Sequence, residues 1–117
     1  MEFKVIYYKD RSGNSIVAEF LDELSIKNKV LFNKAAKELE KLRNRVYHKE
    51  PFSKYIEQGL WEVRIMSGTD ALRILYTFRK GQIIILLHVF IKKSKKTPIG
   101  ELEIARKRLG ELKMEES

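Results

Sequence analysis

Three runs of apolar and β-favouring residues dominate the second half of the chain, and two glycine-containing turns separate them. The first run alternates apolar and polar residues, which is the pattern of a strand with one covered face. The third run is almost wholly apolar, as expected of a strand that is covered on both faces. Glycine in the turns supplies the positive φ that tight hairpins require. These features predict a three-stranded antiparallel meander with strands at residues 60–66, 71–78 and 83–91.

Helical periodicity dominates the residues before the meander, apart from a short strand predicted at residues 2–8. Apolar residues recur at i, i+3, i+4 and i+7 within residues 15–24, and Asn14 or Ser15 would cap that helix. Ser25 is expected to cap a second helix, and the two helices would form an αα-hairpin on one face of the sheet. The apolar face of this second helix consists of Leu31, Ala35, Leu39, Leu42 and Val46.

Two further segments complete the predicted fold. Residues 47–59 show no clean period and contain Pro51, so they are expected to form a loop. Thr97 and Pro98 are expected to be the N-cap and first position of a C-terminal helix. The order β-α-α-β-β-β-α predicts an α+β fold in a single domain, residues 1–117. Its sheet would be four-stranded and mostly antiparallel.

Composition narrows the class of partner. The chain has 117 residues, 44% of them apolar, and a net charge of +8, which favours an anionic partner such as RNA, DNA or a ribosome. There is no cysteine for disulfides or thiolate metal sites. The N-terminus lacks a signal-peptide pattern, and no apolar run reaches the roughly 20 residues of a membrane span. We therefore expect a cytoplasmic protein without a membrane partner.

Cations within and directly after the predicted strands are the main candidates for chemistry. Arg73 interrupts an apolar run, so it needs a buried anion or a ligand, and an ion pair with Glu62 across the hairpin is an alternative explanation. Arg64 could be an ordinary polar residue on an edge strand. Four lysines end the last strand and precede a helix N-terminus, which attracts phosphate, although such runs are usually solvated. These lysines are Lys92, Lys93, Lys95 and Lys96.

Other kinds of site find little support in the sequence. His48 and His88 lie far apart without carboxylates at ligand spacing, and there is no Walker loop or dinucleotide fingerprint. No metal or other cofactor is therefore expected. Strand alternation places His88 on the face of Phe90 and Lys92, although a histidine in an apolar strand is more often a satisfied core residue.

A cluster of cations suits RNA cleavage by attack of a 2′-OH on the adjacent phosphate. Guanidinium groups can stabilise the crowded and more negative phosphorane through paired hydrogen bonds. A lysine among other cations has a lowered pKa, which allows it to act as a base near neutrality.

The chain resembles the RelE/HigB superfamily of bacterial toxins, and in particular its phage-associated HigB-like branch. The resemblance rests on the element order and on four runs in sequence: LWEVR, ALRILY, IILLHVFIKKSKKTP and EIARKR. It implies a RelE-like, microbial-RNase-like fold and a toxin of a type II toxin–antitoxin module that cleaves mRNA on the ribosome. It also implies a hetero-oligomer with a cognate antitoxin, usually a HigA-like helix-turn-helix protein.

Residue by residue, the resemblance implies that Arg73 binds phosphate and that Arg64, Lys92 and Lys93 match further basic positions of the family. Glu62 departs from the pattern, because the RelE branch has a lysine there. Lys54, His88 or Lys95 would then substitute in the chemistry, or the mechanism differs.

The expected catalytic residues are therefore Arg73, Arg64, Lys92, Lys93 and His88. The expected RNA-binding residues are Lys54, Lys95 and Lys96. Two alternatives stay open: a ParE-like gyrase inhibitor without nuclease activity, and a non-enzymatic, phage-derived nucleic-acid-binding protein.

Overall fold

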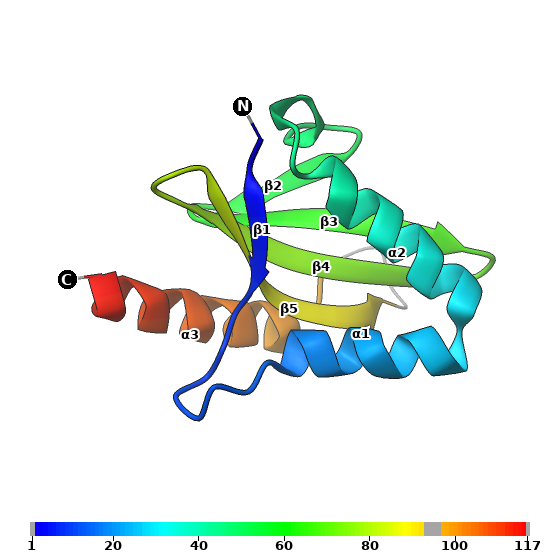
Figure 1. Cartoon of the computed structure of the whole chain (residues 1–117), viewed down its shortest axis with the longest axis horizontal. Coiled ribbons are helices and arrows are strands. Elements are labelled where there is room, and N and C mark those ends of the chain that lie inside the picture. Colours follow the sequence, from blue (N-terminus) through cyan, green and yellow to red (C-terminus); the bar gives the residue numbers. More distant parts are fainter. Residues whose placement is uncertain (1, 93–96, 117) are drawn as a thin grey trace.

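The computed structural model describes residues 2–92 and 97–116. Three helices and five strands make up this part of the chain (Figure 1). Within it, no helix has both the length and the apolar character that a membrane crossing demands. The elements are β1 (Lys4–Tyr7), α1 (Ile16–Lys27), α2 (Lys29–Lys41), the 3₁₀ helix η1 (Arg45–Tyr47), β2 (Ser53–Glu57), β3 (Leu60–Ser67), β4 (Asp70–Arg79), β5 (Ile83–Lys92) and α3 (Ile99–Glu116).

The five strands form one sheet in the order β1-β5-β4-β3-β2. β1 runs parallel to β5 and all other pairs are antiparallel, so the α+β class and the meander are confirmed. The predicted count of four strands is wrong, because part of the expected loop forms β2. Lys54 and Tyr55 are exposed there, so this edge strand lacks the buried alternation that reveals a strand in a sequence.

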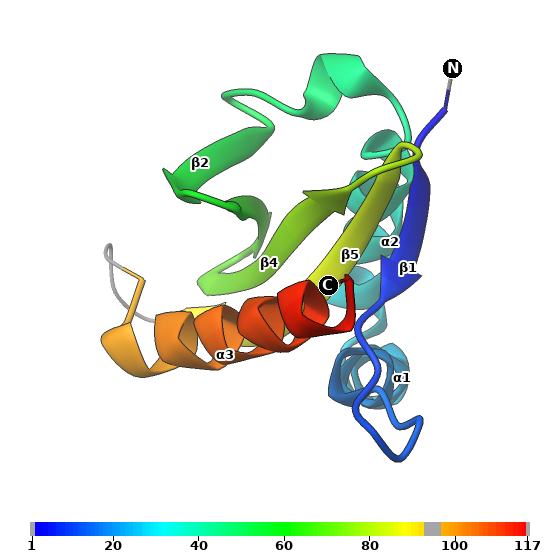
Figure 2. The same ribbon diagram turned by 90° about the vertical axis from the view of Figure 1, so that its left-hand side faces the viewer.

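The helices lie on opposite faces of the sheet. α1 and α2 pack against one face and α3 against the other, as Figures 1 and 2 show. Each face has its own core, and the central strands β4 and β5 supply apolar side chains to both cores. This explains why residues 83–91 read as a nearly continuous apolar run.

Capping residues set the limits of the hairpin helices. Ser15 caps α1, since its hydroxyl accepts from the Ala18 amide at 3.2 Å. Ser25 does not start the second helix, because α1 continues to Lys27 and the Ser25 hydroxyl donates to the Asp22 carbonyl at 2.5 Å. Asn28 caps α2 instead, with its side chain accepting from the Leu31 amide. An Asn that ends one helix and caps the next allows the tight bend between them.

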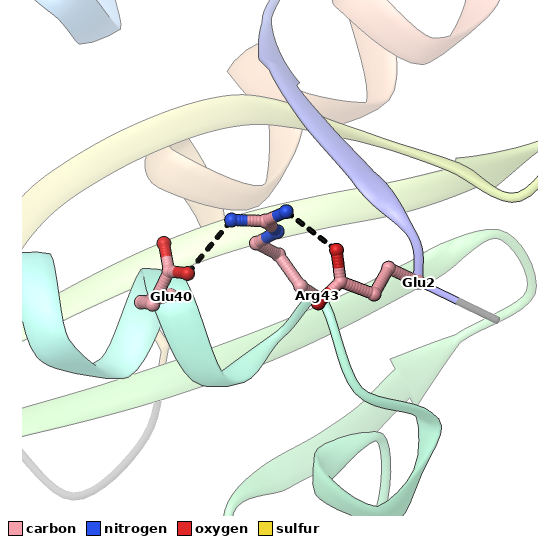
Figure 3. A network of polar contacts seen from close by, with 3 residues as sticks. All are labelled: Glu2, Glu40 and Arg43. Carbon is pink, nitrogen blue, oxygen red and sulfur yellow. Dashed lines mark hydrogen bonds and ion pairs between the residues drawn. The ribbon is translucent and has the colours of Figure 1, made fainter.

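An exposed arginine network ties the start of the chain to the end of α2 (Figure 3). The Arg43 guanidinium binds Glu40 Oε1 at 2.8 Å and Glu2 Oε2 at 2.5 Å. The Arg43 carbonyl also accepts from the Phe3 amide at 2.8 Å. Arg43 therefore holds β1 in place beside α2 and has both ends of its guanidinium paired.

A bulge in β5 changes which side chains face α3. Leu75 pairs with His88 and Tyr76 with Leu86, so Leu87 has no partner residue on β4. Leu87 packs in the α3-side core, and the next residue, His88, also contacts α3. A bulge thus reverses the parity of the strand beyond it, which sets the face of every later side chain up to Lys92.

Candidate functional site

Four cationic side chains surround one carboxylate on the α3-side face of the sheet. Strand register brings them together: Lys54 pairs with Glu62, and Arg64 pairs directly with Arg73. Lys92 lies two residues beyond Phe90, which pairs with Arg73 and packs in the α3-side core. We call Lys54, Glu62, Arg64, Arg73 and Lys92 the cation cluster.

Arg73 is the most unusual member of the cation cluster, because it is buried and short of acceptors. Its side chain is 6% exposed, and Nη1 lies 3.5 Å from Oε1 of the equally buried Glu62. Neither Nε nor Nη1 has a hydrogen-bond partner among the described residues. A buried donor without an acceptor costs about 1–3 kcal/mol. Burial and the nearby Arg64 lower the pKa of Arg73, while Glu62 opposes them.

Arg43 shows what a structural arginine in this chain looks like. It is half exposed and has two carboxylate partners, which raise its pKa. Arg73 has one carboxylate at longer range and is desolvated. The unfilled hydrogen-bonding capacity of Arg73 suits an anion with several oxygens, such as a phosphate.

Glu62 is held from two sides. Oε1 faces Arg73, and Oε2 accepts from the Thr97 hydroxyl at 3.0 Å. The expectation that Thr97 caps α3 is therefore wrong. The helix begins at Ile99. Its first helical hydrogen bond runs from the Leu102 amide to the Pro98 carbonyl. Glu62 instead connects β3 to the segment that leads into α3.

Lys92 is buried at the end of β5, where its environment disfavours the charged form. Burial lowers the pKa of Lys92, and Arg73, Arg64 and Lys54 lower it further against the opposing effect of Glu62. A lysine of this kind loses its proton more easily than an exposed one, which suits a general base.

His88 lies on the same face of the sheet, but both nitrogen atoms of its ring contact side chains of α3. Nε2 lies 2.7 Å from Glu101 Oε2, and Nδ1 lies 3.4 Å from an Arg108 nitrogen. The ring also stacks on Phe90, and burial lowers the pKa of His88. These contacts match the alternative of a satisfied core histidine, and a catalytic role for His88 stays a prediction.

The remaining sequence candidates divide into two groups. Arg64 and Lys54 are exposed on neighbouring strands of the cation cluster. Lys93, Lys95 and Lys96 lie outside the described residues. In the described ranges, no group of three His, Asp or Glu side chains could hold a metal ion.

A hollow of about 400 Å³ adjoins the cation cluster and was not expected from the sequence. It is lined by Lys54, Glu62 and Arg64 of β2 and β3 and by Glu50, Pro51 and Phe52 of the segment before β2. An aromatic residue beside a proline in an aperiodic segment was the available signal for this part of the lining.

The fold and the cation cluster together define a small basic α+β protein with four cations gathered on one sheet face. Residues 19–110 match the family described as phage derived protein Gp49-like (DUF891), and the chain belongs to that family. This family, described as phage-derived, is related to RelE/HigB-type toxins, and membership of it is consistent with a toxin-like protein. No curated protein matches the chain. The matched range contains the whole cation cluster.

Proposed function

We propose that the chain is the toxin of a type II toxin–antitoxin module and cleaves mRNA on the ribosome. The observation that carries this proposal concerns Arg73, which lies beside Arg64 and Lys92. Two of its buried nitrogen atoms have no acceptor among the described residues. The oxygens of an RNA phosphate would supply those acceptors. Membership of the phage-derived family supports the toxin assignment.

The chemistry assigns roles to three members of the cation cluster. The neutral Lys92 amine takes the proton of the 2′-OH, and the 2′-oxygen attacks the adjacent phosphorus. Arg73 and Arg64 stabilise the negative phosphorane as it forms. The bond from phosphorus to the 5′-oxygen then breaks, and the leaving oxygen takes a proton from water. The products are a 2′,3′-cyclic phosphate and a free 5′-OH, and the reaction requires no metal or other cofactor.

The positive charge of the chain also supports the proposed partners. A net charge of +8 favours association with the ribosome and its mRNA. Neutralisation would come from a cognate antitoxin in a toxin–antitoxin hetero-oligomer, with a helix-turn-helix protein of the HigA-like type as our expectation.

Primer extension on a reporter transcript tests the proposal. After induction of the protein, we expect cuts confined to the translated frame, which disappear when translation is blocked. Arg64→Gln should lose most cleavage, while Arg43→Gln serves as the matched control because Arg43 lies in the network of Figure 3. Added EDTA should leave cleavage by purified protein and ribosomes unchanged. An intact transcript together with a DNA-damage response would instead indicate gyrase inhibition.

A further inference from the structure

The hollow beside the cation cluster has the features of a site for one nucleotide base. Its volume of about 400 Å³ falls within the roughly 300–1,000 Å³ of small-ligand pockets. Its lining includes Lys54 and Arg64, which belong to the cation cluster. It also includes an aromatic residue and a carboxylate, Phe52 and Glu50.

Phe52 is positioned as a stacking surface. The residue is 38% exposed, although phenylalanine gains by burial. Tyr47 meets it edge-on, with ring centroids 4.7 Å apart and planes 80° apart, and thereby holds its orientation. Proteins that bind single-stranded nucleic acids often have a fixed, accessible aromatic ring beside cations, so that bases stack on the ring and phosphates bind the cations.

Glu50 supplies the polar contact that would select among bases. Its side chain is exposed and makes no hydrogen bond or ion pair within the described part of the chain. A carboxylate only accepts hydrogen bonds, so it favours a base edge with two adjacent donors. Guanine has such an edge in N1–H and the N2 amine. Adenine and cytosine place an acceptor beside their amine, and uracil places its single N–H between two carbonyls.

We propose that this hollow binds a guanine base, stacked on Phe52 and read by Glu50, next to the phosphate that Arg64 and Lys54 hold. The inference rests on the proposed function, because it takes the ligand to be RNA. It extends that function by naming the base and by assigning Phe52 and Glu50 to its recognition. Both residues contact the base rather than the reacting atoms, so they set specificity.

Binding of uncleavable RNA measures this site separately from catalysis. The probes are 2′-O-methyl uridine hexamers that carry one central guanosine, adenosine or cytidine, together with the all-uridine hexamer. Fluorescence anisotropy at low salt gives the dissociation constants. We expect the guanosine hexamer to bind about tenfold more tightly than the others, as a bidentate contact to a base edge allows.

Two variants and two controls test the residue assignments. Phe52→Leu should weaken binding of the guanosine hexamer about tenfold, because one stacked base is lost. Glu50→Gln should remove the guanosine preference and leave the other hexamers unchanged, and its exposed position keeps folding intact. Tyr7→Leu and Glu103→Gln alter an exposed aromatic and an exposed carboxylate elsewhere, so both should behave like the natural chain.

The outcomes separate this inference from the proposed function. Equal affinity for all four hexamers, unchanged by Phe52→Leu and Glu50→Gln but lost in Arg64→Ala, would overturn the guanine site and leave phosphate binding in place. Absence of binding to every hexamer at low salt would overturn both. A guanosine preference that Glu50→Gln abolishes would establish the site.

Discussion

The buried pair of Arg73 and Glu62 allows activity to be separated from stability. Arg73→Met keeps an unbranched apolar stem but leaves the Glu62 carboxylate, 3% exposed, without its guanidinium. Removing one partner of a buried ion pair costs about 3–5 kcal/mol. Domains of this size unfold with about 5–15 kcal/mol in total. The single variant should therefore lose much of its stability, and inactivity alone would prove little.

The double variant Arg73→Met/Glu62→Gln removes both buried charges together. Replacing a buried ion pair by well-packed hydrophobic residues of similar volume is often neutral or stabilising by about 1–4 kcal/mol. The substitution of Arg73 also removes two nitrogen atoms that lack acceptors among the described residues, each of which costs about 1–3 kcal/mol, and the amide that replaces Glu62 keeps an oxygen for the Thr97 hydroxyl. The double variant should thus be more stable than the single variant. Its mRNA cleavage should still fall about 100- to 1,000-fold, as after loss of a donor to a transition-state anion.

Denaturant unfolding and primer extension on purified variants measure the two quantities independently. The control is Arg43→Met/Glu40→Gln, an exposed pair whose loss should leave stability nearly unchanged and cleavage intact. A folded double variant that cleaves at the natural rate would remove Arg73 from the site. A single variant as stable as the double would show that Glu62 does not depend on Arg73.

Three further predictions test the electrostatics and the packing. RNA binding should weaken about twentyfold between roughly 50 and 200 mM salt if Lys54, Arg64 and Arg73 contact phosphates; a flat response in an anisotropy titration would contradict this. Because burial lowers the pKa of His88 in the folded state, the unfolded chain takes up that proton first as the pH falls. The free energy of unfolding should thus decrease as the pH falls below about 6.5, and His88→Gln should flatten this decrease; equal slopes of stability against pH for the two proteins would argue against it. Gly59 has φ +85°, so Gly59→Ala should destabilise the fold by about 1–2 kcal/mol, whereas Gly110→Ala within α3 should stabilise it by up to about 1 kcal/mol. Equal melting temperatures for Gly59→Ala and Gly110→Ala would refute this prediction.

The local periodicity of apolar residues was sufficient to predict most of the helices and strands. The apolar spacing of α1 and α2 and the meander of β3, β4 and β5 are properties of neighbouring residues, and the structure confirms them. The predicted extension of the second helix to Val46 is wrong, because α2 ends at Lys41 and Val46 is exposed in η1. The position of Arg73 within an apolar run also indicated a buried partner, and Glu62 is that partner. Such inferences succeed because burying an unpaired charge is costly wherever the chain folds.

Contacts between distant segments decided the rest. β2 is a strand because β3 offers it hydrogen bonds, although its own residues are too exposed to show alternation. The unpaired Leu87 sets the face of Lys92, and Thr97 donates to Glu62 instead of capping α3. The hollow at Phe52 forms because the fold brings the segment before β2 close to residues of β3. The sequence by itself determines which side chains prefer burial or pairing, whereas the tertiary structure decides which of them meet, because register, bulges and packing depend on residues far apart in the chain.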